Sequence, residues 1–228
     1  ARCESHLYLQ RQLREAQAFC GVFPQLAERI VMIGNMLPDE SVVLQADKSI
    51  SDFPEDGCIR LLSVGRFCTA KNFDNVPRIC SLLREAGLNV KWYLIGFGGD
   101  EELIRQRIAE SDMQEHVIIL GKKSNPYPYM RACDLYVQPS RYEGNCVSVR
   151  EAQMLGKPVV ITNYATSASQ LQDGVDGIVV PMDNVGCAAG LAALLRDPQR
   201  MELLRENCLK RDYSNAQEVE KLYALMGD

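Results

Sequence analysis

The sequence has no hydrophobic run long enough to span a membrane. Apolar segments such as 117–120 in this chain of 228 residues are far shorter than the ~20 residues that cross a bilayer. The first residues also lack the apolar stretch of a secretory signal, so we expect a cytoplasmic protein. Positive charge is in slight deficit, with 25 Lys and Arg against 30 Asp and Glu, so no overall field favours a nucleic-acid partner.

Metal-binding patterns are also scarce. Only two histidines are present, and none of the nine cysteines belongs to a C-x-x-C pair. Zinc and redox motifs need ligands paired at short spacing, and a histidine-based nucleophilic triad has little support. We interpret the cysteines as reduced and mostly packed side chains of a cytosolic protein.

From residue 58 onward, short apolar runs alternate with longer segments of helical periodicity. The predicted strands cover 59–64, 90–95, 117–120, 135–137, 159–161 and 178–180. The predicted helices cover 74–86, 101–110, 127–132, 147–155, 167–172, 185–195 and 198–209. Strands that are apolar throughout are buried on both faces, as in parallel sheets. The pattern predicts an α/β fold, a Rossmann-like parallel sheet with helices on both faces and a ligand at the carboxyl ends of its strands.

The two ends of the chain depart from this alternation. Residues 5–19 and 215–226 have the pattern of further helices, and the polar stretch 39–57 is interpreted as a loop. Asp183 or Asn184 is a suitable amino-terminal cap for the helix that follows.

The loop after the fourth predicted strand carries most of the predicted chemistry. It contains Glu143 and Gly144, and a helix is expected to begin near Asn145. The free backbone N–H groups of Asn145, Cys146 and Val147 at such a helix start would form a phosphate site. Gly144 would let a ligand approach the backbone closely.

Two glutamates, Glu143 and Glu151, flank this predicted phosphate site. An ionised carboxylate only accepts hydrogen bonds, so it suits hydroxyl groups rather than phosphate. A molecule with hydroxyls on both sides of a phosphate is a sugar nucleotide.

This stretch resembles the E-x7-E motif of retaining glycosyltransferases with the two-domain GT-B fold, family 4 in particular. Other segments resemble motifs of that family in the same order along the chain: 62–67 with Lys71 and Asn72, then 94–100, 134–140, 157–160 and 173–177. The resemblance covers residues 35–227 and implies one half of a GT-B fold.

The resemblance implies roles for the matching residues. Arg66 and Lys71, which follow Gly65, would hold the donor diphosphate together with the N–H groups at the start of the helix. Glu151 would accept the ribose hydroxyls. Glu143 would be the catalytic residue that contacts the transferred sugar and balances positive charge at its anomeric carbon.

The remaining expectations concern the base and the leaving group. Lys122 lies where the family contacts the base, although Lys122 and Lys123 are equally well interpreted as a solvated loop. Two cations and a helix start neutralise leaving-group charge without a metal, and no D-x-D triplet occurs, so we predict no metal and no cofactor. The family's aromatic-glycine pair after the first glutamate is Asn145-Cys146 here, which leaves the details of sugar recognition open.

The domain organisation follows from the same resemblance. Residues 1–37 correspond to a remnant of an amino-terminal acceptor domain and linker, 38–212 to the donor-binding domain, and 213–228 to a crossover helix. We expect a UDP-sugar donor, a saccharide or lipid-linked acceptor, and a role in bacterial polysaccharide synthesis. The absent amino-terminal domain would complete the site, so this chain would be inactive alone, and the parent enzyme could contact the inner face of the membrane peripherally.

Several alternatives stay open at this stage. The chain could be a GT-B relative such as a sugar-nucleotide epimerase or a phosphorylase, or a non-catalytic nucleotide-binding module. Residues 96–99 fit a plain turn better than a dinucleotide-binding motif. Tyr127 and Tyr129 fit packing better than stacking on a ligand.

Overall fold

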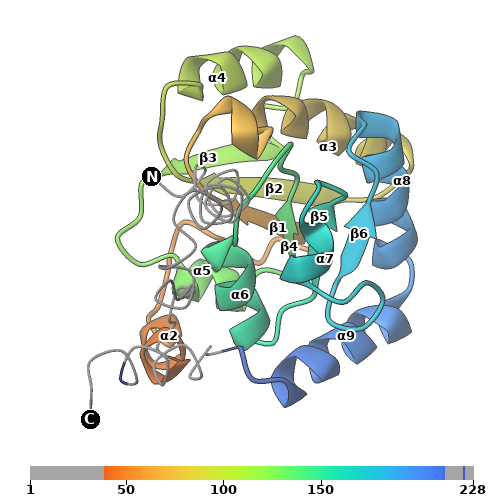
Figure 1. Cartoon of the computed structure of the whole chain (residues 1–228). Coiled ribbons are helices and arrows are strands. Elements are labelled where there is room, and N and C mark those ends of the chain that lie inside the picture. Colours follow the sequence, from red (N-terminus) through yellow and green to blue (C-terminus); the bar gives the residue numbers. More distant parts are fainter. Residues whose placement is uncertain (1–38, 214–222, 224–228) are drawn as a thin grey trace, which may run out of the picture.

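The computed structural model describes residues 39–213 and residue 223 (Figure 1). The predictions for 1–37 lie outside the described residues, as does the predicted helix at 215–226 apart from Tyr223.

Six strands form one parallel sheet in the order β3-β2-β1-β4-β5-β6. They are β1 (Ile59–Val64), β2 (Val90–Ile95), β3 (Val117–Gly121), β4 (Leu135–Gln138), β5 (Val159–Thr162) and β6 (Ile178–Val180). Every adjacent pair is parallel, which confirms the predicted Rossmann-like sheet. The strand order reverses between β1 and β4, and ligands of such sheets bind in the crevice at that reversal.

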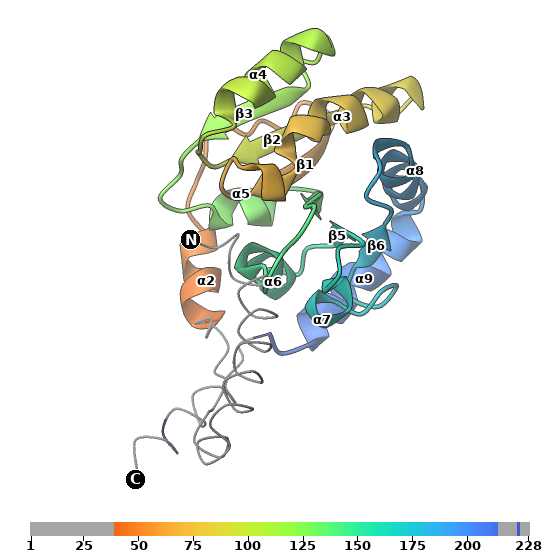
Figure 2. The same ribbon diagram turned by 45° about the horizontal axis from the view of Figure 1, so that its top comes forward.

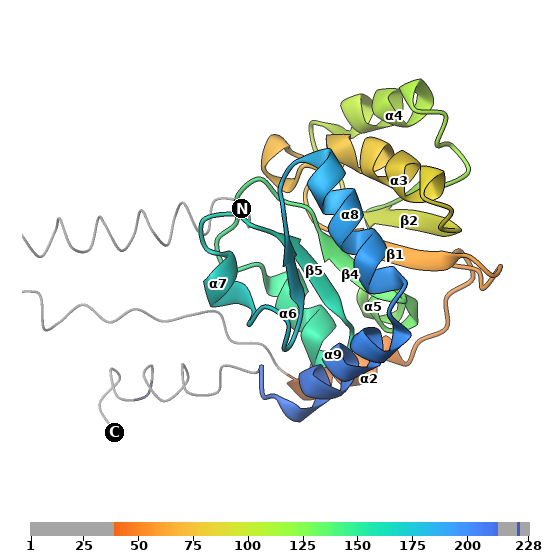
Figure 3. The ribbon, with the colours of Figure 1, turned by 90° about the vertical axis from the view of Figure 1, so that its right-hand side faces the viewer.

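Helices cover both faces of the sheet, as Figures 1 and 3 show. One face carries α3 (Val76–Glu85), α4 (Glu101–Glu110) and α8 (Asn184–Leu195). The other carries α5 (Tyr127–Ala132), α6 (Val147–Met154) and the short α7 (Ser167–Gln170), while α9 (Pro198–Lys210) contacts both α6 and α8.

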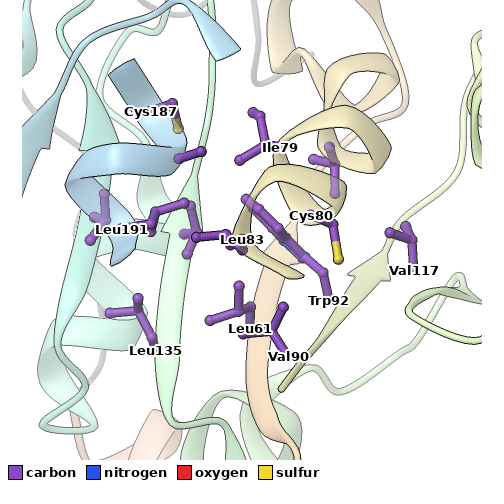
Figure 4. Close-up of a cluster of buried hydrophobic side chains, with 14 of the residues drawn as sticks. Leu61, Ile79, Cys80, Leu83, Val90, Trp92, Val117, Leu135, Cys187 and Leu191 are labelled. Carbon is purple, nitrogen blue, oxygen red and sulfur yellow. The ribbon is translucent and has the colours of Figure 1, made fainter. Parts of the chain in front are cut away.

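The core between the sheet and α3 and α8 is apolar with one satisfied polar pair. Leu61 of β1, Leu83 of α3 and Leu191 of α8 gather there with no exposed surface (Figure 4). Trp92 donates its indole N–H to the Ser63 hydroxyl over 2.9 Å, and Ser63 donates to the Val137 carbonyl. Because a buried polar group without a partner is costly, this chain of hydrogen bonds allows the indole to lie under α3.

The interpretation of 39–57 as a loop is wrong for its first part. Asp39–Ala46 forms helix α2, which packs against α5 (Figure 2). Val42 and Ala46 lie one helical turn apart and are buried. The apolar residues Val42, Val43 and Leu44 are consecutive and so show no helical periodicity, and the contact with α5 supplies the stabilisation instead.

Two other local predictions, the cap of α8 and the start of α3, agree more closely with the structure. Asp183 caps α8 and accepts the Gly186 N–H over 2.8 Å. The predicted helix at 74–86 begins two residues late, because a 3-10 turn, η3 (Phe73–Asn75), precedes α3.

The described cysteines are free thiols, and most are buried. Burial raises the pKa of Cys80, Cys133 and Cys187 to about 12, so these thiols stay protonated at neutral pH. This agrees with their interpretation as packed side chains. Within 39–213, no helix has the length and apolar character needed to cross a membrane.

Candidate functional site

A cavity of about 400 Å³ opens at the carboxyl ends of β1 and β2, beside the start of α6. This volume is in the range of small-molecule sites. Its lining comes from four segments: Val64, Gly65, Arg66 and Lys71; Ile95, Gly96 and Phe97; Lys122, Lys123, Ser124, Pro126 and Tyr127; and Asn145, Cys146, Val147, Ser148 and Glu151.

The structure brings most of the predicted site residues together in this cavity. The lining includes Gly65, Arg66, Lys71, Lys122, Asn145, Cys146, Val147 and Glu151. Glu143 and Gly144 are buried and do not line it. Glu143 instead lies directly against Lys71.

Lys71 and Glu143 form a buried ion pair. The Lys71 ammonium donates to Glu143 Oε1, and the exposed fractions of the two side chains are only 5% and 1%. The same oxygen accepts the Ser140 hydroxyl over 2.5 Å and the Gln138 amide over 3.3 Å. Glu143 Oε2 is buried and has no hydrogen-bond partner within the described residues. One carboxylate oxygen is therefore surrounded by donors while the other lacks one.

Glycine at position 65 makes room for the Lys71 side chain. A Cβ at Gly65 would lie 3.1 Å from Lys71 Cε, closer than nearly all such contacts in proteins. Asn72 then turns the chain in the left-handed region, with φ of 61°, and donates its side-chain amide to the Pro139 carbonyl over 2.8 Å. Asparagine tolerates this conformation better than most residues, so the loop after β1 is tied to the end of β4.

Arg141 also links the loop after β1 to the loop after β4. Its guanidinium contacts both carboxylate oxygens of Asp74, at 2.9 and 2.7 Å, and donates to the Thr69 carbonyl over 2.6 Å. Such bidentate pairs fix geometry as well as adding energy. The loop after β1, which carries Lys71, and the loop after β4, which carries Glu143, are therefore held in a fixed position relative to each other.

The start of α6 offers a different set of N–H groups from the predicted one. The Cys146 N–H is already bound, because it donates to Gln170 Oε1 over 2.7 Å. The prediction of a free N–H at Cys146 is thus wrong for this structure. Val147 and Ser148 are the first two residues of the helix, and the N–H groups of a first turn have no intrahelical acceptor.

Cys146 also contributes a thiol beside the ion pair. Its Sγ lies 3.7 Å from Lys71 Nζ and 3.3 Å from the Ser148 hydroxyl. Burial, together with the charge of Glu143, raises the pKa of Cys146. The thiol is therefore a neutral group at this point of the cavity.

Glu151 lines the cavity one turn further along α6. It is 5% exposed, and Tyr127 donates its hydroxyl to Glu151 Oε1 over 3.1 Å. Packing was the favoured interpretation of Tyr127, and the structure shows that it lines the cavity and donates a hydrogen bond to this carboxylate. Tyr129 does pack. Its ring meets the Phe53 ring edge to face, with 5.7 Å between the ring centres, and its hydroxyl donates to Asp52 Oδ1 over 2.7 Å.

The opposite side of the cavity is more exposed. The Lys122 ammonium lies 5.0 Å from the ring centre of Phe97, which is 53% exposed. Lys123 pairs with Asp52 over 2.6 Å. A Cβ on Gly96 would lie 1.8 Å from the Gly65 carbonyl oxygen, so the glycine turn serves close approach of two loops, as the turn interpretation predicts.

Among the described residues, no three His, Cys, Asp or Glu side chains lie together as a metal site would require. Metal independence remains a prediction.

Comparison with known proteins identifies the family. Residues 46–211 match the family described as "Glycosyl transferases group 1". The chain belongs to this family. The resemblance seen in the sequence is thereby confirmed for this group 1 glycosyl transferase.

Two curated relatives illustrate the range of the family. The amylovoran biosynthesis glycosyltransferase AmsK of Erwinia amylovora is 28% identical over 145 residues, which are 60% of this chain and 35% of that protein. A 4-alpha-N-acetylgalactosaminyltransferase of Campylobacter jejuni, named for a diphospho-undecaprenol substrate, is 30% identical over 60% of this chain and 37% of that protein. The chain thus spans little more than a third of the length of these relatives.

Solved structures agree on the fold. HepE of Anabaena, solved in complex with UDP-glucose, aligns with a TM-score of 0.71 at 21% identity, over 87% of this chain and 58% of that one. TarM of Staphylococcus aureus, in a complex that contains UDP, gives 0.71 at 21% identity over 87% of this chain and 40% of that one. These similarities establish that the sheet is a Rossmann-like half of the GT-B type.

Some site residues were absent from the sequence prediction. Ser148 follows the predicted Val147 in a helix start, and Phe97 lies in a strand-end glycine turn, and both positions were a usable signal. Gln138 lies within the strand segment that resembles the family and only five residues before Glu143, so its position was a signal as well. Gln170 carries no such signal, because its partner Cys146 is brought close only by the fold.

Proposed function

We propose that this chain is the donor-binding part of a retaining, metal-independent glycosyltransferase that uses a UDP-sugar. The observation that carries the proposal is the single cavity that combines cationic side chains, the start of α6 and the Glu151 carboxylate. Each of these suits a different part of a nucleotide sugar.

The diphosphate suits the cationic end of the cavity. Arg66 is exposed there and forms no ion pair with any described residue, and Lys71 lines the same cavity. The first turn of α6 adds the N–H groups of Val147 and Ser148 and the positive end of the helix dipole. In this proposal these groups stabilise the charge that develops on the departing diphosphate, which is the role a metal ion fills in other transferases.

Hydroxyl groups suit the two glutamates. Glu151 lines the cavity and would accept hydrogen bonds from the ribose hydroxyls. Tyr127, whose hydroxyl donates to Glu151 Oε1, would hold the carboxylate in position. Glu143 Oε2 is buried without a donor, and such an atom costs free energy until a donor reaches it. Glu143 does not line the cavity, so a hydroxyl of the transferred hexosyl unit would have to reach this oxygen beside Lys71, which does. The carboxylate would then stabilise positive charge at the anomeric carbon.

The acceptor side of the reaction would be supplied by an amino-terminal domain, so residues 38–212 would bind the donor without transferring it. The Erwinia relative is named for amylovoran biosynthesis and the Campylobacter relative for a diphospho-undecaprenol. These names support a saccharide or lipid-linked acceptor in bacterial polysaccharide synthesis. They also support peripheral contact of the parent enzyme with the inner face of the membrane.

The test is ligand binding to this chain, measured by calorimetry and thermal shift with UDP, GDP, ADP, UDP-glucose and UDP-N-acetylglucosamine. We expect UDP and at least one UDP-sugar to bind and, at 100 times the dissociation constant, to add about 2.7 kcal/mol of stability. The binding should persist in EDTA. Failure of all five nucleotides to bind, loss of binding in EDTA, or sugar transfer by this chain alone would each contradict a named part of the proposal.

A further inference from the structure

We propose that Gln138 is a positioning residue that sets which oxygen of the Glu143 carboxylate is left for the donor sugar. The inference rests on the proposed function, and it adds a residue outside the E-x7-E motif to that site. Gln138 ends β4, has no exposed surface and does not line the cavity. Its side-chain amide donates to Glu143 Oε1, so it acts on the donor sugar through that carboxylate.

The orientation of the Gln138 amide follows from Ser140 and Glu143. Gln138 points its Nε2 at the Ser140 hydroxyl oxygen, 3.0 Å away, and at Glu143 Oε1, 3.3 Å away. The Ser140 hydroxyl gives its one proton to Glu143 Oε1, and a carboxylate only accepts, so both groups need a donor from Gln138. Gln138 Oε1 then lies on the side of the Tyr136 hydroxyl, which is within 3.1 Å of it and within 3.4 Å of the Val64 carbonyl.

The amide helps to saturate one oxygen of the carboxylate. Glu143 Oε1 receives Lys71, Ser140 and Gln138, whereas Oε2 receives no described donor. Any further donor, such as a sugar hydroxyl, is directed to Oε2. Without Gln138, the carboxylate could turn so that Lys71 bridges both oxygens, and the free acceptor would be lost.

A glutamine suits this role because it is neutral. A carboxylate at position 138 would lie about as close to Glu143 as the present amide does, and two such carboxylates repel unless they share a proton. A protonated carboxyl at 138, in contrast, would donate to Glu143 as the amide does. The side chain at 138 thus offers a way to turn the positioning on and off with pH.

The first experiment measures how Gln138→Met changes the affinity of the chain for UDP-glucose, UDP-N-acetylglucosamine and UDP. Methionine keeps the volume and removes the donor. We expect affinity for the UDP-sugar that the wild-type chain binds to fall roughly tenfold, as for a lost hydrogen bond to a charged group. Affinity for UDP should stay within about twofold, because UDP lacks the hexosyl unit that would meet Oε2.

The second experiment follows Gln138→Glu between pH 5 and pH 9, as the loss of UDP-sugar affinity relative to wild type at the same pH. We expect little loss at pH 5, where the new carboxyl donates, and a growing loss as it ionises. The other groups that face Glu143 are Lys71, the Cys146 thiol and the Tyr164 hydroxyl, and Tyr136 faces Gln138. Burial raises the pKa of Cys146, Tyr136 and Tyr164, so each of these three stays mainly protonated in this window.

Gln153→Glu is the matched control. Gln153 is as fully buried as Gln138, but its amide bonds the Asp176 carbonyl over 3.2 Å. Thermal unfolding of each variant at each pH confirms the folded state. The control should show the cost of a buried carboxyl without a pH-dependent change in the preference for UDP-sugar over UDP.

The possible outcomes separate the two proposals. If wild type binds a UDP-sugar and Glu143→Gln weakens that binding, but both Gln138 variants match wild type, the role of Gln138 is refuted while the donor site stands. Equal losses for UDP and UDP-sugar would make Gln138 a general structural residue and would also refute it. If the wild-type chain binds no UDP-sugar, the proposed function fails, and this inference fails with it.

Discussion

The two sides of the cavity are built in different ways. The inner wall, formed by Lys71 and Cys146, is buried, and Lys71 is held by an ion pair with Glu143, which does not itself line the cavity. The outer wall, formed by Phe97, Lys122 and Lys123, is more exposed and has two cation–ring contacts and one ion pair with Asp52. The same sheet edge therefore presents one preorganised side and one adaptable side.

This difference matches what each wall would do in the proposed function. Charge develops where the sugar leaves the diphosphate, and donors fixed in advance stabilise such charge most effectively. A flat base needs only an apolar surface and a few polar contacts. We therefore expect substitutions in the inner wall to change stability and binding together, and substitutions in the outer wall to change binding slightly.

Lys71→Met tests the inner wall and should have the largest effect. It leaves the Glu143 carboxylate buried without its cation, and breaking a buried ion pair in this way costs about 3–5 kcal/mol of folding free energy. UDP affinity should fall as well, since the cation faces the cavity. Chemical denaturation and calorimetry measure the two effects.

The double variant Lys71→Met with Glu143→Gln is the control for that prediction. Removing both charges should recover most of the lost stability but none of the UDP affinity. A single variant as stable as wild type would show that the inner wall is not the coupled unit described above.

Arg66→Ala should have the next largest effect, and on binding alone. Arg66 is exposed at the cavity and unpaired within the described part of the chain, so its loss leaves no buried charge. We expect UDP affinity to weaken by about 1.5–3 kcal/mol, the contribution of a charged hydrogen bond, with the unfolding midpoint unchanged. Arg78→Ala, on an exposed helix face paired with Glu85, should leave both quantities unchanged.

The contrast between the walls also explains what the sequence predicts well. The parallel sheet and eight residues of the cavity lining follow from periodicity and from motifs that are contiguous in the chain. The Lys71–Glu143 pair does not, because it joins positions far apart in sequence, and each residue alone looked like a separate ligand contact. The Cys146 N–H was predicted free because its acceptor, Gln170, arrives from a helix that shows no pattern pointing to that contact.

Lys122→Ala tests the outer wall. Lys122 contacts the Phe97 ring, and a cation over an exposed ring contributes about 0.5–1 kcal/mol. We expect a loss of stability no larger than this, and a smaller loss of UDP affinity than for Arg66→Ala, measured under the same conditions. A loss as large as that of Arg66→Ala would show that Lys122 contacts the phosphates, and the distinction between the two walls would fail at this residue.

Asp52→Asn should have the smallest effect, on stability alone. The hydrogen bond from Lys123 lowers the pKa of Asp52 below its usual value of 3.8, so the ionised form contributes stability above that pH and loses it as the pH falls through the lowered value. The Lys123 and Asp52 side chains are 25% and 43% exposed. Ion pairs that are solvated to this extent contribute only a few tenths of a kcal/mol to folding stability. The difference in stability between wild type and variant should therefore be small at pH 7 and vanish once the pH has fallen below the lowered pKa of Asp52. A difference of several kcal/mol at pH 7 would mean that the outer wall is as tightly coupled as the inner one.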